Sequence, residues 1–146
     1  MRRCAVAWLV TGLALATPSL AKAQSTTPRG GQVELLQNYP NPFNPTTTIP
    51  FRLSADLFAN GHRPVVSLRI YNVLAQLVAI PTLQGQGRPL DGVQLDCVDQ
   101  SGGYCTFSAY WDGYYLNTGR EAASGIYVYQ LVVDGVRESK KMVVTK

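Results

Sequence analysis

The clearest fold signal in the chain is IYVYQLVVDGVRESKKMVVT, residues 126–145. Two runs rich in valine and other strand-forming residues, 126–133 and 137–145, lie on either side of Asp134-Gly135. An Asp-Gly pair between such runs favours a two-residue turn, because both residues tolerate positive φ. The sequence therefore predicts an antiparallel β-hairpin at this end of the chain.

Similar runs recur upstream of the hairpin. They are rich in Val, Ile, Leu, Tyr and Thr, and they are separated by Gly, Pro, Asn and Asp, with no sustained 3.6-residue period. This pattern indicates short strands and turns. The predicted strands are residues 33–37, 47–53, 65–71, 75–80, 105–111, 126–133 and 137–145. About seven short strands over residues 33–146 predict an all-β domain, an immunoglobulin-like antiparallel sandwich.

One connection between the predicted strands is unusually long. Residues 82–103, TLQGQGRPLDGVQLDCVDQSGG, are polar and rich in glycine. A connection of this length is uncommon in a compact domain unless it binds something or is held by a cross-link. A cysteine near its far end offers such a cross-link.

The amino-terminal residues have the order of a secretory signal peptide. Arg2 and Arg3 precede an apolar run over residues 4–16, and a helix-breaking segment and an Ala-Lys-Ala triplet follow. A signal peptidase recognises small residues in this arrangement, so we expect cleavage between Ala23 and Gln24. The apolar run is too short to span a bilayer as a helix, which disfavours a permanent anchor.

Cleavage changes the charge of the chain. The whole chain has 13 Lys and Arg against 9 Asp and Glu, a net charge of +4, but three of these cations lie within residues 1–23. The mature chain then carries about +1, too little for the basic surface that nucleic-acid binding requires. We expect a polar, flexible leader at residues 24–32, one domain at residues 33–146, no nucleic-acid partner and no transmembrane segment after cleavage.

Cys97 and Cys105 are the two cysteines that remain after cleavage. An even number of cysteines in an exported chain favours a disulfide, and the loop-closure model assigns about 2–3 kcal/mol to a loop this short. The alternative use of the pair is a metal site, but His62 is the single histidine and lies far away in sequence. The disulfide is therefore the favoured prediction.

Residues suited to catalysis or metal binding are sparse. One histidine and the absence of a G-x-S-x-G motif give no support to a Ser-His-Asp site. The glutamates are expected at strand ends or turns, without a cleft for a glycosidase pair. Asp91, Asp96 and Asp99 share the long connection, but their spacing fits no calcium loop. The sequence predicts a non-enzymatic protein with no cofactor and no metal, and it identifies no small-molecule substrate.

Aromatic residues cluster around Trp111-Asp112-Gly113. This motif is either a ligand-binding aromatic beside a carboxylate or, as we favour, a core tryptophan followed by an Asp-Gly turn. The tyrosines nearby form either an exposed adhesive or sugar-stacking face or part of the core, and strand alternation should place some of them outward. These tyrosines are Tyr104, Tyr110, Tyr114, Tyr115, Tyr127 and Tyr129.

The segment NYPNPFNP, residues 38–45, contains three prolines, which have no amide hydrogen and so exclude a central strand. We call this segment the strap. We expect it to lie rigidly along a sheet edge, with Tyr39 and Phe43 docked onto the sandwich. Its role is either to cover that edge or to be recognised by a partner.

The strap belongs to a longer pattern that resembles a known family. Residues 36–49, LQNYPNPFNPTTTI, are similar to the opening of the C-terminal sorting domains of the bacterial type IX secretion system. These domains are related to the immunoglobulin-like domain of the flagellar hook-capping protein. Four further motifs follow in the family's order: LRIYNVL at 68–74, WDG at 111–113, ASGIYVYQL at 123–131 and KKMVV at 140–144.

The resemblance implies a domain that the secretion machinery recognises in the periplasm and delivers to the cell surface or the medium. In related proteins the domain is often removed, with the cargo attached to surface lipopolysaccharide. Three features depart from the family: Ala75 stands where glycine is usual, residues 82–103 are longer than usual, and no cargo accompanies the domain. The alternative is a periplasmic or surface subunit, structural or binding, that docks onto a larger membrane-associated protein assembly.

The last predicted strand, residues 137–145, is the second candidate recognition element. A strand at a sheet edge leaves one row of backbone groups for a partner to extend by strand addition. Lys140 and Lys141 point to opposite faces, so at least one should be exposed. The predicted partner-recognition residues are Tyr39, Pro40, Asn41, Pro42, Phe43, Lys140, Lys141, Met142, Val143 and Val144.

Overall fold

The computed structural model describes residues 31–146. The predicted signal peptide, its cleavage site between Ala23 and Gln24, and most of the predicted leader lie outside the described residues. Among residues 31–146, no helix has the length and apolar character needed to cross a membrane. The elements are β1 (Val33–Leu35), β2 (Thr47–Ser54), η1 (Ala55–Gly61), β3 (Val65–Tyr71), β4 (Leu77–Ala79), β5 (Thr82–Leu83), β6 (Arg88–Pro89), β7 (Val93–Gln94), β8 (Gln100–Ser101), β9 (Tyr104–Trp111), β10 (Gly125–Val133) and β11 (Val136–Val144).

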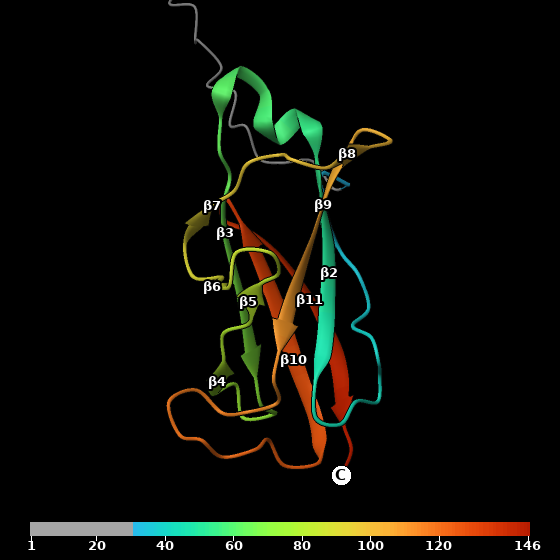
Figure 1. The fold of residues 1–146 in the computed structure, drawn as a ribbon, viewed down its shortest axis with the longest axis vertical. Coiled ribbons are helices and arrows are strands. Elements are labelled where there is room, and N and C mark those ends of the chain that lie inside the picture. The colour runs from blue at the N-terminus through green and yellow to red at the C-terminus, as the bar shows by residue number, and fades with distance from the viewer. Residues whose placement is uncertain (1–30) are drawn as a thin grey trace, which may run out of the picture.

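The strands form two antiparallel sheets that enclose one core. The first sheet has the order β1-β2-β9-β5-β6, with β8 also paired to β9, and the second has the order β11-β10-β3-β4, with β7 also paired to β3. The long strands β2 and β9 lie over β10 and β11 along the long axis of the molecule (Figure 1). The all-β, two-sheet architecture predicted from the sequence is therefore confirmed.

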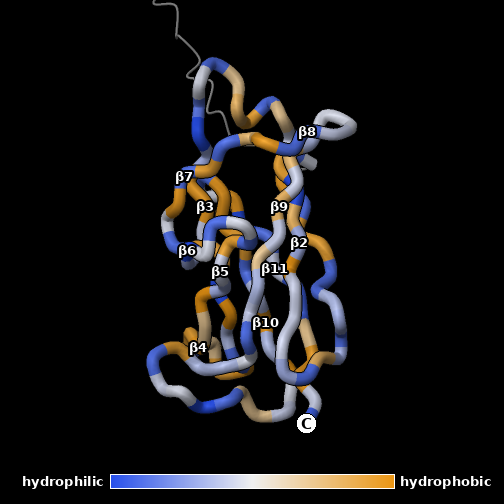
Figure 2. Tube along the Cα trace, viewed as in Figure 1, coloured by the Kyte–Doolittle hydropathy of each residue, from blue (hydrophilic) through white to orange (hydrophobic). Residues whose placement is uncertain are grey.

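Alternation along the strands creates the core. In β2 the buried residues are Thr47, Ile49, Phe51 and Leu53, and every second residue from Tyr127 in β10 is buried too. Successive side chains of a strand point to opposite faces, so this period of two directs one row of each strand inward. In Figure 2, hydrophobic and hydrophilic residues are interspersed along several of the strands.

The seven predicted strands all have counterparts in the structure, and the four additional strands all lie in the connection expected to be a polar loop. Leu83, Leu90, Val93 and Leu95 of this segment are buried in the common core. Backbone bonds also dock it, since Leu68 N donates to Leu90 O at 2.9 Å. The sequence analysis did not predict these short strands, which form because a few well-spaced apolar residues anchor the connection despite its polar composition.

Cys97 and Cys105 form a disulfide in the structure, with their Cα atoms 5.4 Å apart. Cys105 lies in β9 and is fully buried, whereas Cys97 lies near the end of the long connection. The bond therefore attaches the far end of this connection to a central strand of the first sheet.

Candidate recognition surface

The strap joins the two sheets. At its start, Tyr39 and Thr48 of β2 exchange backbone bonds of 2.9 and 2.8 Å. Further on, Phe43 N donates to Val143 O and Thr145 N donates to Phe43 O, both at 3.0 Å. In Figure 1 the strap runs beside β2 and reaches β11 near the carboxyl terminus. The two predicted recognition elements, about 100 residues apart, are thus in direct contact.

A buried polar cluster holds the start of the strap. The Asn38 side chain is 2 % exposed, and its Nδ2 donates to Thr47 Oγ1 at 3.0 Å and to Pro40 O at 3.2 Å. Asn38 N donates to the Tyr129 hydroxyl, which in turn donates to Leu36 O at 2.7 Å. Burial raises the pKa of Tyr129, which keeps the hydroxyl protonated as a donor. Among residues 31–146, no buried side-chain nitrogen or oxygen lacks a hydrogen-bond partner, and this holds for the cluster too.

The sequence analysis missed Asn38, Thr47 and Tyr129 as parts of this site. Asn38 and Tyr129 are 91 residues apart, and Asn38 and Thr47 are 9 apart. The one local signal was Asn38 itself, a polar residue directly before the Tyr-Pro pair. Its burial depends on partners that only the tertiary fold brings near.

The two aromatic residues of the strap have different environments. Phe43 is 1 % exposed, and its ring packs edge-on against Trp111 with centroids 5.4 Å apart. Tyr39 is 57 % exposed, so the expectation that both rings dock onto the sandwich was wrong for Tyr39. The Asn38 side chain points into the core. Because successive side chains of an extended segment point to opposite sides, the Tyr39 side chain points to the solvent.

The Trp-Asp-Gly motif is a core-and-turn element, as favoured from the sequence. Trp111 is buried, and its Nε1 donates to Tyr114 O at 3.0 Å. Asp112 Oδ1 accepts from Tyr114 N at 3.0 Å, which closes the turn. Gly113 has φ +83°, and a Cβ added there would lie 2.1 Å from Pro45 O. The turn thus requires glycine for two reasons: the backbone angle φ is positive, and any larger side chain would overlap the strap at Pro45.

The tyrosines around this motif are divided between core and surface. Tyr127 and Tyr129 are buried, whereas Tyr110 and Tyr114 are each 38 % exposed. The Tyr115 and Tyr127 hydroxyls are 2.9 Å apart. The pKa of Tyr127 is raised, mainly by burial, and the pKa of Tyr115 is lowered, mainly by its backbone hydrogen bond with Ala123. Part of the group therefore builds the core and part remains accessible.

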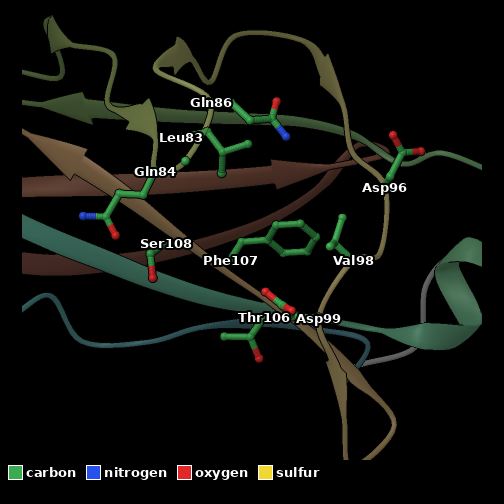
Figure 3. A pocket seen from close by; sticks show the side chains of 10 residues that line it. Leu83, Gln84, Gln86, Asp96, Val98, Asp99, Thr106, Phe107 and Ser108 are labelled. Atoms are coloured by element: carbon green, nitrogen blue, oxygen red, sulfur yellow. The ribbon is translucent and has the colours of Figure 1, made fainter.

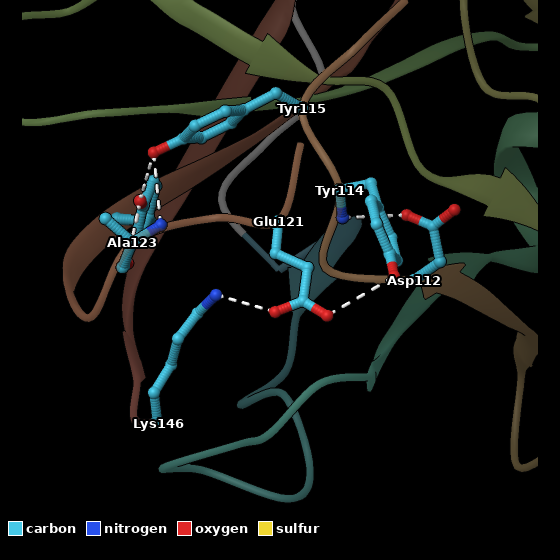
Figure 4. Close-up of polar contacts among 7 residues, drawn as sticks. Asp112, Tyr114, Tyr115, Glu121, Ala123 and Lys146 are labelled. Carbon is cyan, nitrogen blue, oxygen red and sulfur yellow. Dashed lines mark hydrogen bonds and ion pairs between the residues drawn. The ribbon is translucent and has the colours of Figure 1, made fainter. Parts of the chain in front are cut away.

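Figure 4 shows the polar contacts on the loop between β9 and β10. Lys146 Nζ lies 2.7 Å from Glu121 Oε2, and the Tyr114 hydroxyl donates to Glu121 Oε1 at 3.3 Å. The hydrogen bond from Lys146, followed by its charge, lowers the pKa of Glu121. The end of the chain is thus held beside this loop by an exposed ion pair.

The last predicted recognition residues fall into two groups. Lys140 and Lys141 are both exposed, whereas the sequence predicted that at least one of them would be. Met142 and Val144 are buried in the core, and the backbone N–H of Val143 donates to Asn41 Oδ1 at 3.0 Å. The suggestion that all of these residues contact a partner was therefore wrong for Met142 and Val144, because they fill the interior.

The accessible candidates lie close together. In the strap, Tyr39, Pro40, Asn41 and Pro42 are exposed, and the backbone of Lys141 is tied to the residue before the strap, since Gln37 Nε2 donates to Lys141 O at 3.1 Å. Phe43, by contrast, anchors the strap from within the core. We call the exposed set the recognition surface: Tyr39, Pro40, Asn41, Pro42, Lys140 and Lys141.

Two carboxylates of the long connection, Asp91 and Asp96, are engaged in ion pairs. Arg63 makes two bonds to Asp96, of 2.6 and 2.7 Å, and Arg69 binds Asp91 at 2.6 Å. The bond to Asp91 raises the pKa of Arg69. Within residues 31–146, no three His, Cys, Asp or Glu side chains are grouped so as to hold a metal ion.

A groove of about 450 Å³ lies between the 83–86 turn and the segment around the disulfide. Phe107 lies at its centre in Figure 3, with Val98 beside it and the Gln84 and Asp99 side chains around it. The ring of Phe107 stacks on Phe51 with centroids 5.3 Å apart, so it also belongs to the core. No sequence motif marked this groove, which arises because β5 and β8 contact different ends of β9.

No protein-family model and no curated protein sequence matches this chain. Among solved structures, it is similar to a chain of the Pseudomonas fluorescens alkylpurine DNA glycosylase AlkC bound to DNA containing an abasic site analog. The two chains are 17% identical with a TM-score of 0.49, and the similarity covers 79% of this chain and 31% of that chain. This chain thus spans less than a third of the length of that neighbour.

Proposed function

We propose that this protein is a non-enzymatic, exported β-sandwich of immunoglobulin-like type that acts as a sorting or surface-display module recognised by the type IX secretion machinery. The observation that carries the proposal is the mutual contact of the motifs on which the resemblance rests. Phe43 of the strap pairs with the end of β11, Pro45 packs on Gly113, and Asn38 binds Tyr129. Motifs scattered over the sequence thus form one structural unit.

The recognition surface is the part of this unit that a secretion protein would contact. It combines a rigid, proline-rich face with two adjacent cations on the edge strand, and neither lysine makes an ion pair within residues 31–146. Exposed charges that are not engaged internally can contribute fully to partner selection. In this proposal the partner is a protein of the export pathway, and the destination is the cell surface or the medium after passage through the periplasm.

The test is to invert these two charges without removing core residues. We expect the double variant Lys140→Glu/Lys141→Glu to pass the inner membrane, fold and accumulate in the periplasm. A matched control, Arg88→Glu/Arg120→Glu, makes the same charge change at exposed sites off β11 and should be delivered normally. Fractionation of medium, surface and periplasm, combined with protease resistance, measures delivery and folding separately.

Deletion of residues 140–146 is the more severe test. We expect signal-peptide export to continue and the truncated protein to remain in the periplasm. The deletion also removes Met142 and Val144 from the core, so its folding has to be established by protease resistance. Normal surface delivery of a folded truncation, or of the double charge variant, would refute the sorting function.

The second candidate is a periplasmic or surface subunit that docks onto a larger membrane-associated assembly. A group of exposed apolar residues near the β3–β4 turn favours it: Val73 and Leu74 are 75 % and 74 % exposed, and Leu77 and Leu116 are 43 % and 41 % exposed. Leu116 N donates to Val78 O at 2.7 Å, which brings the two segments together. Recovery of the protein only in a periplasmic complex, with its carboxyl terminus intact, would support this candidate over sorting.

A further inference from the structure

β11 is the longest edge strand in the described part of the chain. It has nine residues, whereas the other strands with an open side (β1, β4, β6, β7 and β8) have two or three each. Strand addition requires a continuous row of backbone donors and acceptors, because main-chain hydrogen bonds provide the affinity. Among residues 31–146, β11 is therefore the edge where an additional strand fits.

The strap covers one half of this edge. On the side of β11 away from β10, the N–H and C=O of Val143 bind Asn41 and Phe43, and the C=O of Lys141 accepts from Gln37. The contacts of the strap and of Gln37, the residue before it, end at Lys141. In an antiparallel strand, the backbone groups of alternate residues point to the same side. The backbone groups of Arg137 and Ser139 therefore also point away from β10, as those of Lys141 and Val143 do.

Five backbone groups on this side have no hydrogen-bond partner among residues 31–146. They are the N–H and C=O of Arg137, the N–H and C=O of Ser139, and the N–H of Lys141. We call residues 137–141 the open edge. Their spacing matches the row of groups that a neighbouring strand would bind.

The side chains of the open edge are accessible on both faces. All five residues are exposed. Glu138 and Lys140 lie opposite the buried residues Leu131 and Tyr129 of β10, yet they remain exposed, although β1 of the first sheet lies close to β11. Three cations and one anion give the open edge a net charge of about +2.

We propose that the open edge binds an extended, acidic segment of another protein as an additional β-strand next to β11. If two copies of this chain paired through their open edges, a net charge of about +2 on one edge would face the same charge on the other. Like charges across a strand pair are destabilising, so an acidic partner is favoured. This inference rests on the proposed function, because it names the chemistry of the segment that the recognition machinery would offer. It also assigns Arg137 and Ser139, which lie outside the recognition surface, to partner binding.

The test uses isotope-labelled full-length protein and a synthetic peptide of about ten residues that alternates valine and glutamate, long enough for one strand. The control peptide alternates valine and lysine. We expect the acidic peptide alone to slow hydrogen exchange at the amides of Arg137, Ser139 and Lys141 by about tenfold or more. Exchange at Val143, already bonded to the strap, should not change.

Ser139→Pro and Ser139→Ala form a matched pair. Proline removes an N–H that points away from β10, a position where edge strands tolerate it, and both variants lose the same hydroxyl. We expect Ser139→Pro to weaken peptide binding by about tenfold or more, whereas Ser139→Ala binds as the natural protein does. If Ser139→Pro does not fold, the double variant Lys140→Glu/Lys141→Glu tests the inference instead. Its open edge carries a net charge of about −2, so it should bind the basic peptide more tightly than the acidic one.

Three results would overturn the inference: no protection of the three amides at saturating acidic peptide, equal binding of the acidic and basic peptides, or dimerisation of the chain through the open edge without peptide. These results are separable from a failure of sorting. Absence of protection by the acidic peptide, combined with normal delivery of the natural protein, would overturn the inference and leave the proposed function. Peptide binding as described, combined with normal delivery of Lys140→Glu/Lys141→Glu, would instead refute sorting alone.

Discussion

At the scale of single residues, the structure shows positions where backbone conformation restricts the choice of side chain. Ala75 has φ +60° in the β3–β4 turn, where the resembling family usually has glycine. The turn is maintained by Asn72, whose Oδ1 accepts from Leu74 N and Gln76 N at 3.0 Å each. Ala75 therefore holds a conformation that is more usual for glycine, and the Asn72 contacts stabilise it.

Replacement of Ala75 by glycine should stabilise the protein. A left-handed backbone costs an L-residue about 1–2 kcal/mol, and the greater freedom of glycine in the unfolded chain offsets part of this gain. We expect the free energy of unfolding to rise by about 0.5 kcal/mol, measured by denaturant titration. Ala59→Gly is the control, since Ala59 is also exposed but has φ −62°, and it should be destabilising. Equal effects of the two substitutions would contradict the strain argument.

Gly113→Ala should have the opposite effect. The added methyl group would overlap Pro45 O, and the residue would also hold a positive φ. We expect a loss of about 3 kcal/mol in the free energy of unfolding. Gly119→Ala separates the two causes, because Gly119 has φ +65° with open space around its Cβ position. A loss at Gly113 no greater than that at Gly119 would mean that the strap moves aside at little cost.

At the scale of elements, the strap behaves as a rigid connector between the sheets. It replaces the ladder bonds that a regular strand would make with a few backbone bonds at each end and side-chain bonds from Asn38 and Asn41. Three prolines reduce the number of conformations open to the unfolded segment, which lowers the entropy cost of ordering it. The same element covers half of the β11 edge and leaves the other half open.

The two aromatic residues of the strap should differ in what they contribute. Phe43→Ala creates a cavity next to Trp111, and we expect the free energy of unfolding to fall by about 3–5 kcal/mol. Tyr39→Ala removes an exposed ring, so its effect on stability should be within about 0.5 kcal/mol. Thermal and denaturant unfolding measure both. A Tyr39→Ala protein that is stable but fails in delivery would identify Tyr39 as a recognition residue, whereas normal delivery would leave it without a role.

At the scale of the whole molecule, one core unites two sheets and a long connection. The connection contributes buried leucines at positions 83, 90 and 95, and the disulfide fixes its end to β9. The loop closed by Cys97 and Cys105 spans eight residues, so the stabilisation from the bond is modest in the chain-entropy model. Its main effect is to hold the segment that borders the groove near Phe107.

The disulfide should be present in the exported protein. Intact-mass analysis with alkylation should show two additional thiols only after reduction. The double variant Cys97→Ala/Cys105→Ala should lose about 2–3 kcal/mol in the free energy of unfolding. A control reduction of this variant should change neither mass nor stability. Two free thiols in native exported material would refute the prediction.

Sequence patterns alone predicted seven of the strands, the hairpin at Asp134-Gly135 and the cysteine pairing, because each of these depends on local strand and turn chemistry or on a count. It also placed Trp111 in the core and assigned the next two residues to a turn. Alternation with a period of two is a local property, and it correctly predicted that some of the tyrosines near Trp111, such as Tyr110, point outward.

Which surface is available to a partner depends on tertiary contacts. Asn38 is buried because Thr47 and Tyr129 satisfy its polar groups, and Tyr39 is exposed as a consequence of that choice. Met142 and Val144 look like part of a terminal signal, but the core requires their side chains. One half of β11 is covered and the other half is free because the strap, about 100 residues earlier in the sequence, binds only the last part of this strand. Such contacts depend on long-range packing, and no local pattern in the chain records them.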